Sequence, residues 1–116
     1  MNMEKASDVE QVLMNEVDNP DGVYMYLEGD TWCAYERSAY YLSSLRVPVK
    51  LEKEVVRGGY DVVLLKAMFK TSEMTLPLSP MALLKQVSDD KVLFQIKDPA
   101  RGFSQWKADQ LRILSA

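Results

Sequence analysis

Few side chains in this sequence are suited to catalysis, and histidine is absent. Without histidine the chain lacks the commonest general base and the commonest metal ligand. The single cysteine, Cys33, lies near Arg37 and ahead of a predicted helix, an arrangement that can lower a thiol pKa. Glu36 lies equally close, so we expect Cys33 to be a buried and unreactive core residue. One cysteine also excludes an internal disulfide.

Paired carboxylates offer another route to acid–base chemistry or metal binding. Glu52 and Glu54 share one face of a predicted strand, and Asp89 and Asp90 form a predicted turn. Both pairs fit a solvated surface better than a site. No nucleophile–base pair, metal-ligand spacing or glycine-rich phosphate loop can be assembled from the residues present. We therefore expect a protein that is not an enzyme and that uses no metal and no cofactor.

Basic residues gather in the middle of the chain, although the net charge is −3. Residues 1–36 carry nine acids and one base, 37–70 carry three acids and seven bases, and 71–116 carry five acids and six bases. Five bases surround one predicted hairpin and could line a phosphate-binding ridge: Lys50, Lys53, Arg57, Lys66 and Lys70. Their alternation with apolar residues fits the solvated face of a sheet at least as well, and the acidic total opposes non-specific binding to nucleic acid.

The elements that must position these residues follow from hydrophobic periodicity. Ser7 and Glu10 form a capping box ahead of an apolar stripe, and Ser79-Pro80 opens another stripe at Met81, Leu84 and Val87. Together with Ala39, Leu42 and Leu45, these patterns predict helices over 7–18, 38–45 and 79–87. Alternating or β-branched runs predict strands over 23–27, 47–56, 60–69 and 92–96, and 31–35 can pair back as a hairpin. The tail, 103–114, fits a short helix or a strand.

Length and composition indicate a single domain over residues 1–116. The chain is 47% hydrophobic and 27% charged, as in ordinary globular domains. The order of the predicted elements favours the α+β class, with about three helices packed on a mixed sheet. No apolar run is long enough to cross a bilayer, and the N-terminus lacks a basic region followed by an apolar stretch. We expect a cytoplasmic, soluble protein with no membrane partner.

Two blocks of the chain resemble the N-terminal mismatch-recognition domain of MutS DNA repair proteins. The first is a hydrophobic strand, an aromatic-rich turn and a helix, matched at Gly29, Asp30, Trp32, Tyr35, Ala39, Ser43 and Leu45. The second is Met74-Thr75-Leu76-Pro77, followed by the predicted helix 79–87 and strand 91–96. The blocks cover roughly residues 25–96 in the family's order. The resemblance implies a lone domain with the fold of the MutS first domain.

The sequence departs from the family where the family reads mismatches. Thr31 stands where MutS proteins have a phenylalanine wedge, and Cys33 where they have a glutamate that bonds the mispaired base. A threonine cannot stack on a base, and a thiol is a poor acceptor. Mismatch reading by that chemistry is not expected.

The resemblance nevertheless suggests candidate nucleic-acid contacts and leaves the partner open. Trp32, Tyr35 and Arg37 lie where the family meets DNA and form a candidate cluster for stacking and phosphate contact. With Lys50, Lys53 and Arg57 they complete the predicted nucleic-acid surface. Packing in the core is the alternative for both rings. Seven methionines and the irregular tail favour a second partner class, a protein or a second copy of the chain. The expected function is a non-catalytic binding module of unknown ligand, or alternatively a protein-interaction or self-associating domain.

Overall fold

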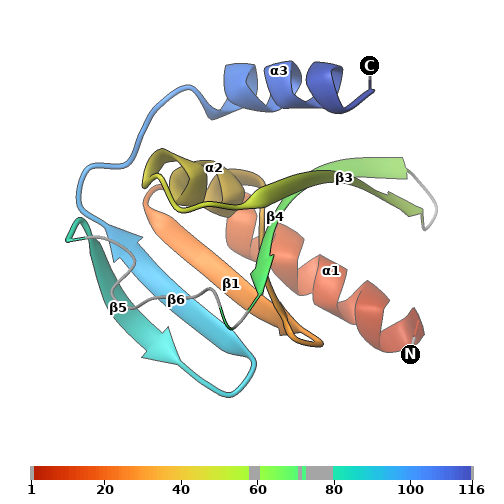
Figure 1. The fold of residues 1–116 in the computed structure, drawn as a ribbon. Helices are drawn as coiled ribbons and strands as arrows, with labels where there is room; N and C mark the ends of the chain where they lie inside the picture. Colours follow the sequence, from red (N-terminus) through yellow and green to blue (C-terminus); the bar gives the residue numbers. More distant parts are fainter. Residues whose placement is uncertain (1, 58–60, 71, 73–79, 116) are drawn as a thin grey trace.

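Three helices and six strands make up the part of the chain that the structure, a computed structural model, describes: residues 2–57, 61–70, 72 and 80–115 (Figure 1). The helices are α1 (Asn2–Glu16), α2 (Glu36–Ser44) and α3 (Phe103–Ser115). The strands are β1 (Gly22–Glu28), β2 (Thr31–Tyr35), β3 (Lys50–Arg57), β4 (Asp61–Lys70), β5 (Ala82–Val87) and β6 (Lys91–Ile96).

All six strands join one sheet in the order β3-β4-β2-β1-β6-β5. Every described pairing is antiparallel, so the sheet is not the mixed sheet that the sequence suggested. The hairpin β1–β2 occupies the centre, and Gly29 takes a φ of 68° in its turn, a conformation that glycine adopts without steric cost. The α+β class and the single domain are confirmed.

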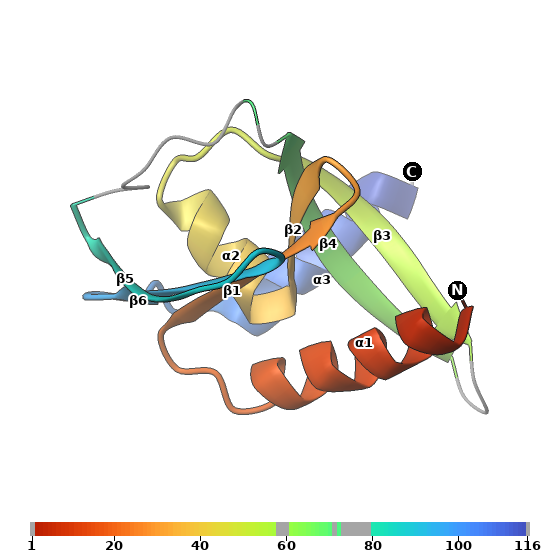
Figure 2. The same ribbon diagram turned by 90° about the horizontal axis from the view of Figure 1, so that it is seen from below.

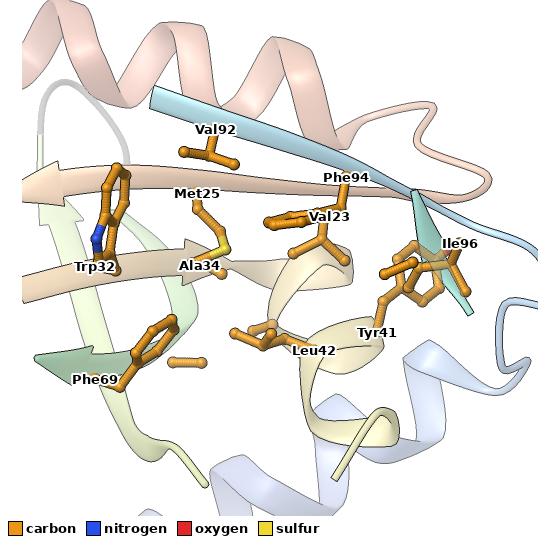
Figure 3. Packing of buried hydrophobic residues seen from close by; sticks show 13 residues of the cluster. Val23, Met25, Trp32, Ala34, Tyr41, Leu42, Phe69, Val92, Phe94 and Ile96 are labelled. Atoms are coloured by element: carbon orange, nitrogen blue, oxygen red, sulfur yellow. The ribbon is translucent and has the colours of Figure 1, made fainter. Parts of the chain in front are cut away.

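One face of the sheet, here the α2 face, carries the main core. Antiparallel partners share a face, so the pairings Met25–Ala34 and Trp32–Phe69 place these side chains together under α2. Figure 3 shows them with Leu42 of α2, and α3 lies outside α2 on the same side (Figure 1). The buried members are Val23, Met25, Trp32, Ala34, Ala39, Tyr41, Leu42, Ala67, Phe69, Ala82, Val92, Phe94 and Ile96.

The opposite face, the α1 face, carries a smaller core. Val12 of α1 packs on Cys33, Tyr35 and Leu64. Viewed from below, α1 runs along the sheet with its N-terminus toward the β3–β4 hairpin, and β5 and β6 lie at the other side of the molecule (Figure 2). Strand β4 is therefore covered on both faces, as its continuous apolar run predicts: Leu64 and Leu65 are 1% and 0% exposed.

Most predicted elements are confirmed within a few residues. The predicted strands 23–27, 47–56, 60–69 and 92–96 correspond to β1, β3, β4 and β6, the segment 31–35 pairs back as β2, and 38–45 corresponds to α2. Part of the predicted hairpin turn after Arg57 lies outside the described residues. The tail, left open between helix and strand, is the helix α3.

Helix α1 begins earlier and ends earlier than the capping box predicts. It starts at Asn2, so Ser7 lies inside the helix and is not its cap. Extending an existing helix costs less than nucleating one, and residues 3–6 include good helix formers. The helix ends at Glu16, which leaves Val17 in the following turn and 75% exposed instead of on the apolar stripe.

The predicted helix 79–87 is wrong over its described part, where residues 82–87 form the edge strand β5. Leu84 and Val87 pair with Phe94 and Val92 of β6, with a bulge between Leu84 and Gln86. A run of this length is too short for periodicity alone to separate helix from strand, and the hairpin with β6 decides the outcome. Position 79 lies outside the described residues. The second block of the MutS resemblance thus lacks its helix over 82–87.

Candidate functional site

The two aromatic residues suggested as a stacking pair lie on opposite faces of the sheet. Trp32 is 8% exposed and packs on the α2 face beside Phe69 (Figure 3). Tyr35 is 5% exposed and packs on the α1 face, where its ring centroid lies 6.1 Å from that of Tyr26. Trp32 and Tyr35 are three residues apart on β2, and successive side chains of a strand point to alternate faces, so an odd spacing places them on opposite faces. Neither ring is accessible to a base in this structure.

Arg37 connects three elements. Its guanidinium lies 4.8 Å from the centroid of the Phe103 ring, and Nη1 donates a hydrogen bond of 3.3 Å to the backbone oxygen of Glu16. These contacts join α2 to α3 and to the end of α1, so the side chain has a structural role in this fold.

The predicted basic ridge is divided between the two faces. Lys50 pairs with Met68 on the α1 face, and Lys53 pairs with Leu65 on the α2 face. Lys50 lies 3.6 Å from a carboxylate oxygen of Glu52, and Lys53 donates to Ser115 Oγ at 3.1 Å. Of Arg57 only the backbone is described. Among the predicted contacts, the structure does not gather Lys50 and Lys53 with Trp32 and Tyr35 into one cluster.

The α1 face holds a charged group that the sequence analysis did not single out, here the Lys66 cluster: Glu28, Tyr35, Glu54 and Lys66. Lys66 Nζ lies 2.8 Å from Glu28 Oε1 and 3.5 Å from Glu54 Oε1, and its side chain is only 11% exposed. The hydroxyl of Tyr35 donates to the second oxygen of Glu28. Glu54, expected on the solvated surface, is instead 19% exposed, and its Oε2 is buried with no hydrogen-bond partner.

Ionisation in this cluster follows from its contacts. Burial raises the pKa of the Tyr35 hydroxyl, and the bond to Glu28 raises it further. Burial opposes the charge on Glu28 and Lys66 and is the largest single effect on each, but their mutual hydrogen bond and the other bonds and charges around them together outweigh it. The pKa of Glu28 is therefore lowered and that of Lys66 is raised. Burial, with Glu28 nearby, raises the pKa of Cys33 to about 12. The thiol is 1% exposed, which confirms the expected buried cysteine.

A pocket of about 280 Å³ opens between α1 and the sheet beside the Lys66 cluster. Its walls combine apolar side chains from α1 and the strands with three members of the cluster, Glu28, Tyr35 and Glu54. The full lining is Val9, Gln11, Val12, Tyr26, Leu27, Glu28, Tyr35, Glu54, Leu64, Asp90 and Lys91.

Glu16 forms a second buried polar group, at the start of α2. Its carboxylate accepts hydrogen bonds from the backbone N–H and the hydroxyl of Ser38 and from Asn19 Nδ2. The side chain is 3% exposed, and burial raises its pKa to about 7, although the bonds from Ser38 and Asn19 oppose the rise. The carboxylate satisfies a free N–H of the helix, as a capping side chain does.

Glu36 fixes the junction between β2 and α2. Its φ of 54° lies in the left-handed region, which is costly for a residue with a side chain. Two bonds hold it there: Leu65 N donates to Oε1 at 2.9 Å, and Lys107 Nζ lies 2.7 Å from Oε2. The same carboxylate therefore ties α3 to the sheet.

The fold and these groups define a single-domain α+β protein with an antiparallel sheet and helices on both faces. Comparison with protein-family models, with curated proteins and with solved structures found no match. The resemblance to the MutS domain is untested by these findings. Among the helices described, none combines the length and apolar character needed to span a membrane.

Proposed function

We propose that the protein is a non-catalytic interaction module that pairs with a second copy of itself along the edge strand β5. The observation that carries this proposal is the exposure of large apolar side chains on that strand. Leu83, Leu84 and Val87 are 56%, 43% and 64% exposed. Apolar residues gathered on one sheet edge are typical of contact surfaces.

The backbone of β5 supports pairing with another strand. Within the described residues, β5 has a strand neighbour on one side only, β6. An edge strand presents N–H and C=O groups that can extend the sheet by one more strand. The bulge between Leu84 and Gln86 disturbs the middle of β5, which favours pairing toward its Val87 end.

Charge complementarity favours a second copy as the partner. A two-fold antiparallel pairing centred on Val87 sets Val87 opposite Val87 of the second copy. Asp89 lies in the turn that follows β5, so this arrangement brings Lys85 of each copy near the turn that carries Asp89 of the other, and groups of opposite charge flank the apolar centre. A two-fold contact uses one surface twice, so no other chain is needed to complement it.

The test is sedimentation velocity over a range of protein concentrations. We expect the native chain to shift from monomer to dimer as concentration rises. Val87→Lys should remain monomeric, because it places two ammonium groups together at the two-fold axis. Val17→Lys is the matched control, since Val17 is also exposed but lies at the end of α1, and it should dimerise normally.

Charge reversal tests the register. Lys85→Glu should weaken the dimer, and Lys85→Glu combined with Asp89→Lys should restore it. A native chain that stays monomeric at every concentration, or equal behaviour of the two valine variants, would overturn the proposal.

Nucleic-acid binding is the other outcome to measure. The rings of Trp32 and Tyr35 are buried, and Lys50 and Lys53 lie on opposite faces of the sheet. We therefore expect no binding of a labelled DNA duplex at about 50 mM salt, where phosphate contacts are strong. Salt-sensitive binding there would favour the nucleic-acid function instead.

A further inference from the structure

We infer that the Glu16 carboxyl group is a pH-sensitive switch, which fixes α1 to the rest of the fold when it is protonated and lets α1 detach from the sheet when it is ionised. The switch lies where α1 meets α2 and does not depend on pairing through β5. Three features support it: the hydrogen bonds around Glu16, the lack of an ion-pair partner among the described residues, and the few other contacts of α1.

The hydrogen bonds at the two oxygens of Glu16 suit a protonated acid. Oε1 accepts two bonds, from Ser38 N at 3.0 Å and from Asn19 Nδ2 at 3.1 Å. Oε2 has one partner, the hydroxyl of Ser38. A protonated carboxyl group has one oxygen that only accepts and one that can donate, and the two oxygens of Glu16 are divided in this way.

The Ser38 hydroxyl has one hydrogen and two acceptors that compete for it. It lies against Glu16 Oε2 and 3.3 Å from the backbone oxygen of Gly22, and it accepts a bond from Tyr24 N. When Glu16 is ionised, the hydrogen goes to the carboxylate, and the bond from Ser38 to Gly22 is lost. When Glu16 is protonated, its own O–H donates to Ser38 Oγ, and Ser38 can donate to Gly22. The acid form therefore makes one more hydrogen bond and links α1, α2 and β1.

No ion pair compensates the ionised form. Among the residues that the structure describes, no ammonium or guanidinium pairs with the Glu16 carboxylate, and Arg37 donates to its backbone oxygen instead. The charged and titratable groups around it are Glu36, Arg37 and Tyr41 of α2, Tyr26 of β1 and Asp21 of the turn before β1. Burial raises the pKa of Glu16 to about 7 and repulsion by Glu36 adds to the rise, although the bonds from Ser38 and Asn19 oppose it.

Few other contacts attach α1 to the sheet. Of residues 9–16 only Val12 and Glu16 are buried, and Val12 packs in the smaller core beside Cys33. Asn15 adds one hydrogen bond to a tyrosine hydroxyl of β1. The helix lies along one face of the sheet (Figure 2) and contributes no strand to it, so α1 can move away while the sheet stays paired.

A rise in pH favours this opening. In the opened molecule α1 is exposed to water, and Glu16 has its ordinary pKa of 4.5, against about 7 in the closed molecule. The closed molecule therefore binds the proton more tightly between these values. From pH 6 to 8 the opened population should increase about tenfold. Opening uncovers Cys33, which is 1% exposed when α1 is in place.

Alkylation of Cys33 by iodoacetamide measures the opening in the full chain. The rate for the folded chain is divided by the rate for the chain unfolded in urea at the same pH, which removes the pH dependence of the thiolate itself. We expect this ratio to rise about tenfold from pH 6 to 8. Glu16→Gln should keep the ratio low and nearly constant, because its amide donates to Ser38 Oγ as the acid does and does not ionise. Glu10→Gln, an exposed position on the same helix, is the matched control and should behave as the native chain.

Hydrogen exchange of the native chain tests whether the opening is local. At pH 8 the amides of residues 9–16 should be much less protected than those of β1 and β2, and their exchange should depend little on low concentrations of urea, because a local opening exposes little surface. Equal protection of α1 and the sheet at pH 8 would show that α1 leaves only when the whole domain unfolds, and it would overturn the inference.

Two results of the alkylation experiment would also overturn it. One is a ratio that stays constant between pH 6 and 8 in the native chain, and the other is the same rise in Glu16→Gln. Val87→Lys should show the native rise, so a failure of the switch is distinguishable from a failure of the proposed dimer.

Discussion

Glu16 is the last residue of α1, and its carboxyl group lies against the first turn of α2. In the unfolded chain the Glu16 carboxyl should have its ordinary pKa of 4.5, whereas in the folded chain its pKa is about 7. The folded state thus binds the proton more tightly between these values. Its contribution to stability is fully present below pH 4.5 and is lost as pH rises through 7.

We therefore expect the free energy of unfolding to fall by about 3 kcal/mol between pH 4.5 and 8 from this group alone. Glu16→Gln keeps an amide of similar shape and removes the titration, so its stability should change much less over that range. Urea unfolding at several pH values measures both chains. Glu10→Gln, an exposed position on the same helix, should keep the native pH dependence. Parallel curves for the native chain and Glu16→Gln would contradict the prediction.

Cys33 offers a second test at the scale of one residue. Cys33→Glu introduces a carboxylate at the position where MutS proteins have one, at a site that is 1% exposed and close to Glu28. We expect a loss of stability of about 3 kcal/mol or more. Thr31→Glu, on the same strand and face but less buried, should cost much less.

Thermal melting compares the two single variants. The double variant Thr31→Phe with Cys33→Glu, assayed with matched and mismatched duplexes, should be destabilised and bind neither. Intact folding with a preference for the mismatched duplex would support the MutS-like function.

Sequence patterns located the buried thiol but not the polar sites. Cys33 sits in a run of aromatic and apolar residues, which predicts burial. Lys66 and Glu54 lie on two different strands, and nothing local to either residue indicates that the β3–β4 register brings them together with Glu28. The one signal available was a lysine in the middle of the apolar strand β4, since a buried lysine requires a carboxylate partner.

At the scale of elements, local patterns predicted strands better than helix boundaries. Strands β1, β4 and β6 have continuous or alternating apolar residues, and the structure pairs them as expected. The edge strand β5 has only one buried residue, Ala82, so its apolar residues carry no alternation that would distinguish strand from helix. Pairing with β6 determines its conformation, and that contact is not contained in the pattern of β5 alone.

Helix α3 should separate from the rest of the fold first. Among its described residues none is fully buried, and its attachment depends on the rings of Tyr40, Phe103 and Trp106 and on the Lys107–Glu36 ion pair. We expect Trp106→Ala to weaken this attachment by about 1–3 kcal/mol. Hydrogen exchange should then accelerate in residues 103–115 and stay unchanged in β1 and β2. Ile113→Ala, an exposed position on the same helix, should leave exchange unchanged. Equal acceleration in α3 and the sheet would show that α3 unfolds only with the whole domain.

At the scale of the molecule, the α+β class followed from the order of elements, whereas the direction of the strands did not. The hairpins β1–β2 and β3–β4 are local and were predicted from their turns, whereas β5–β6 was not, because β5 was predicted as a helix. The pairings β2–β4 and β1–β6 connect the hairpins and make the sheet antiparallel throughout its described part. Such contacts depend on how whole units pack, and a single sequence contains little information about them.

Strand β1 gains its second neighbour last during synthesis. It pairs with β6 in a register that sets Gly22 opposite Gln95, so most of the chain must leave the ribosome before this pairing forms. Until then the hairpin β1–β2 carries Val23 and Met25 beside an unpaired strand edge, which is a template for aggregation. A nascent chain that stalls before residue 91 therefore keeps this edge of β1 unpaired, and formation of the final hairpin closes it.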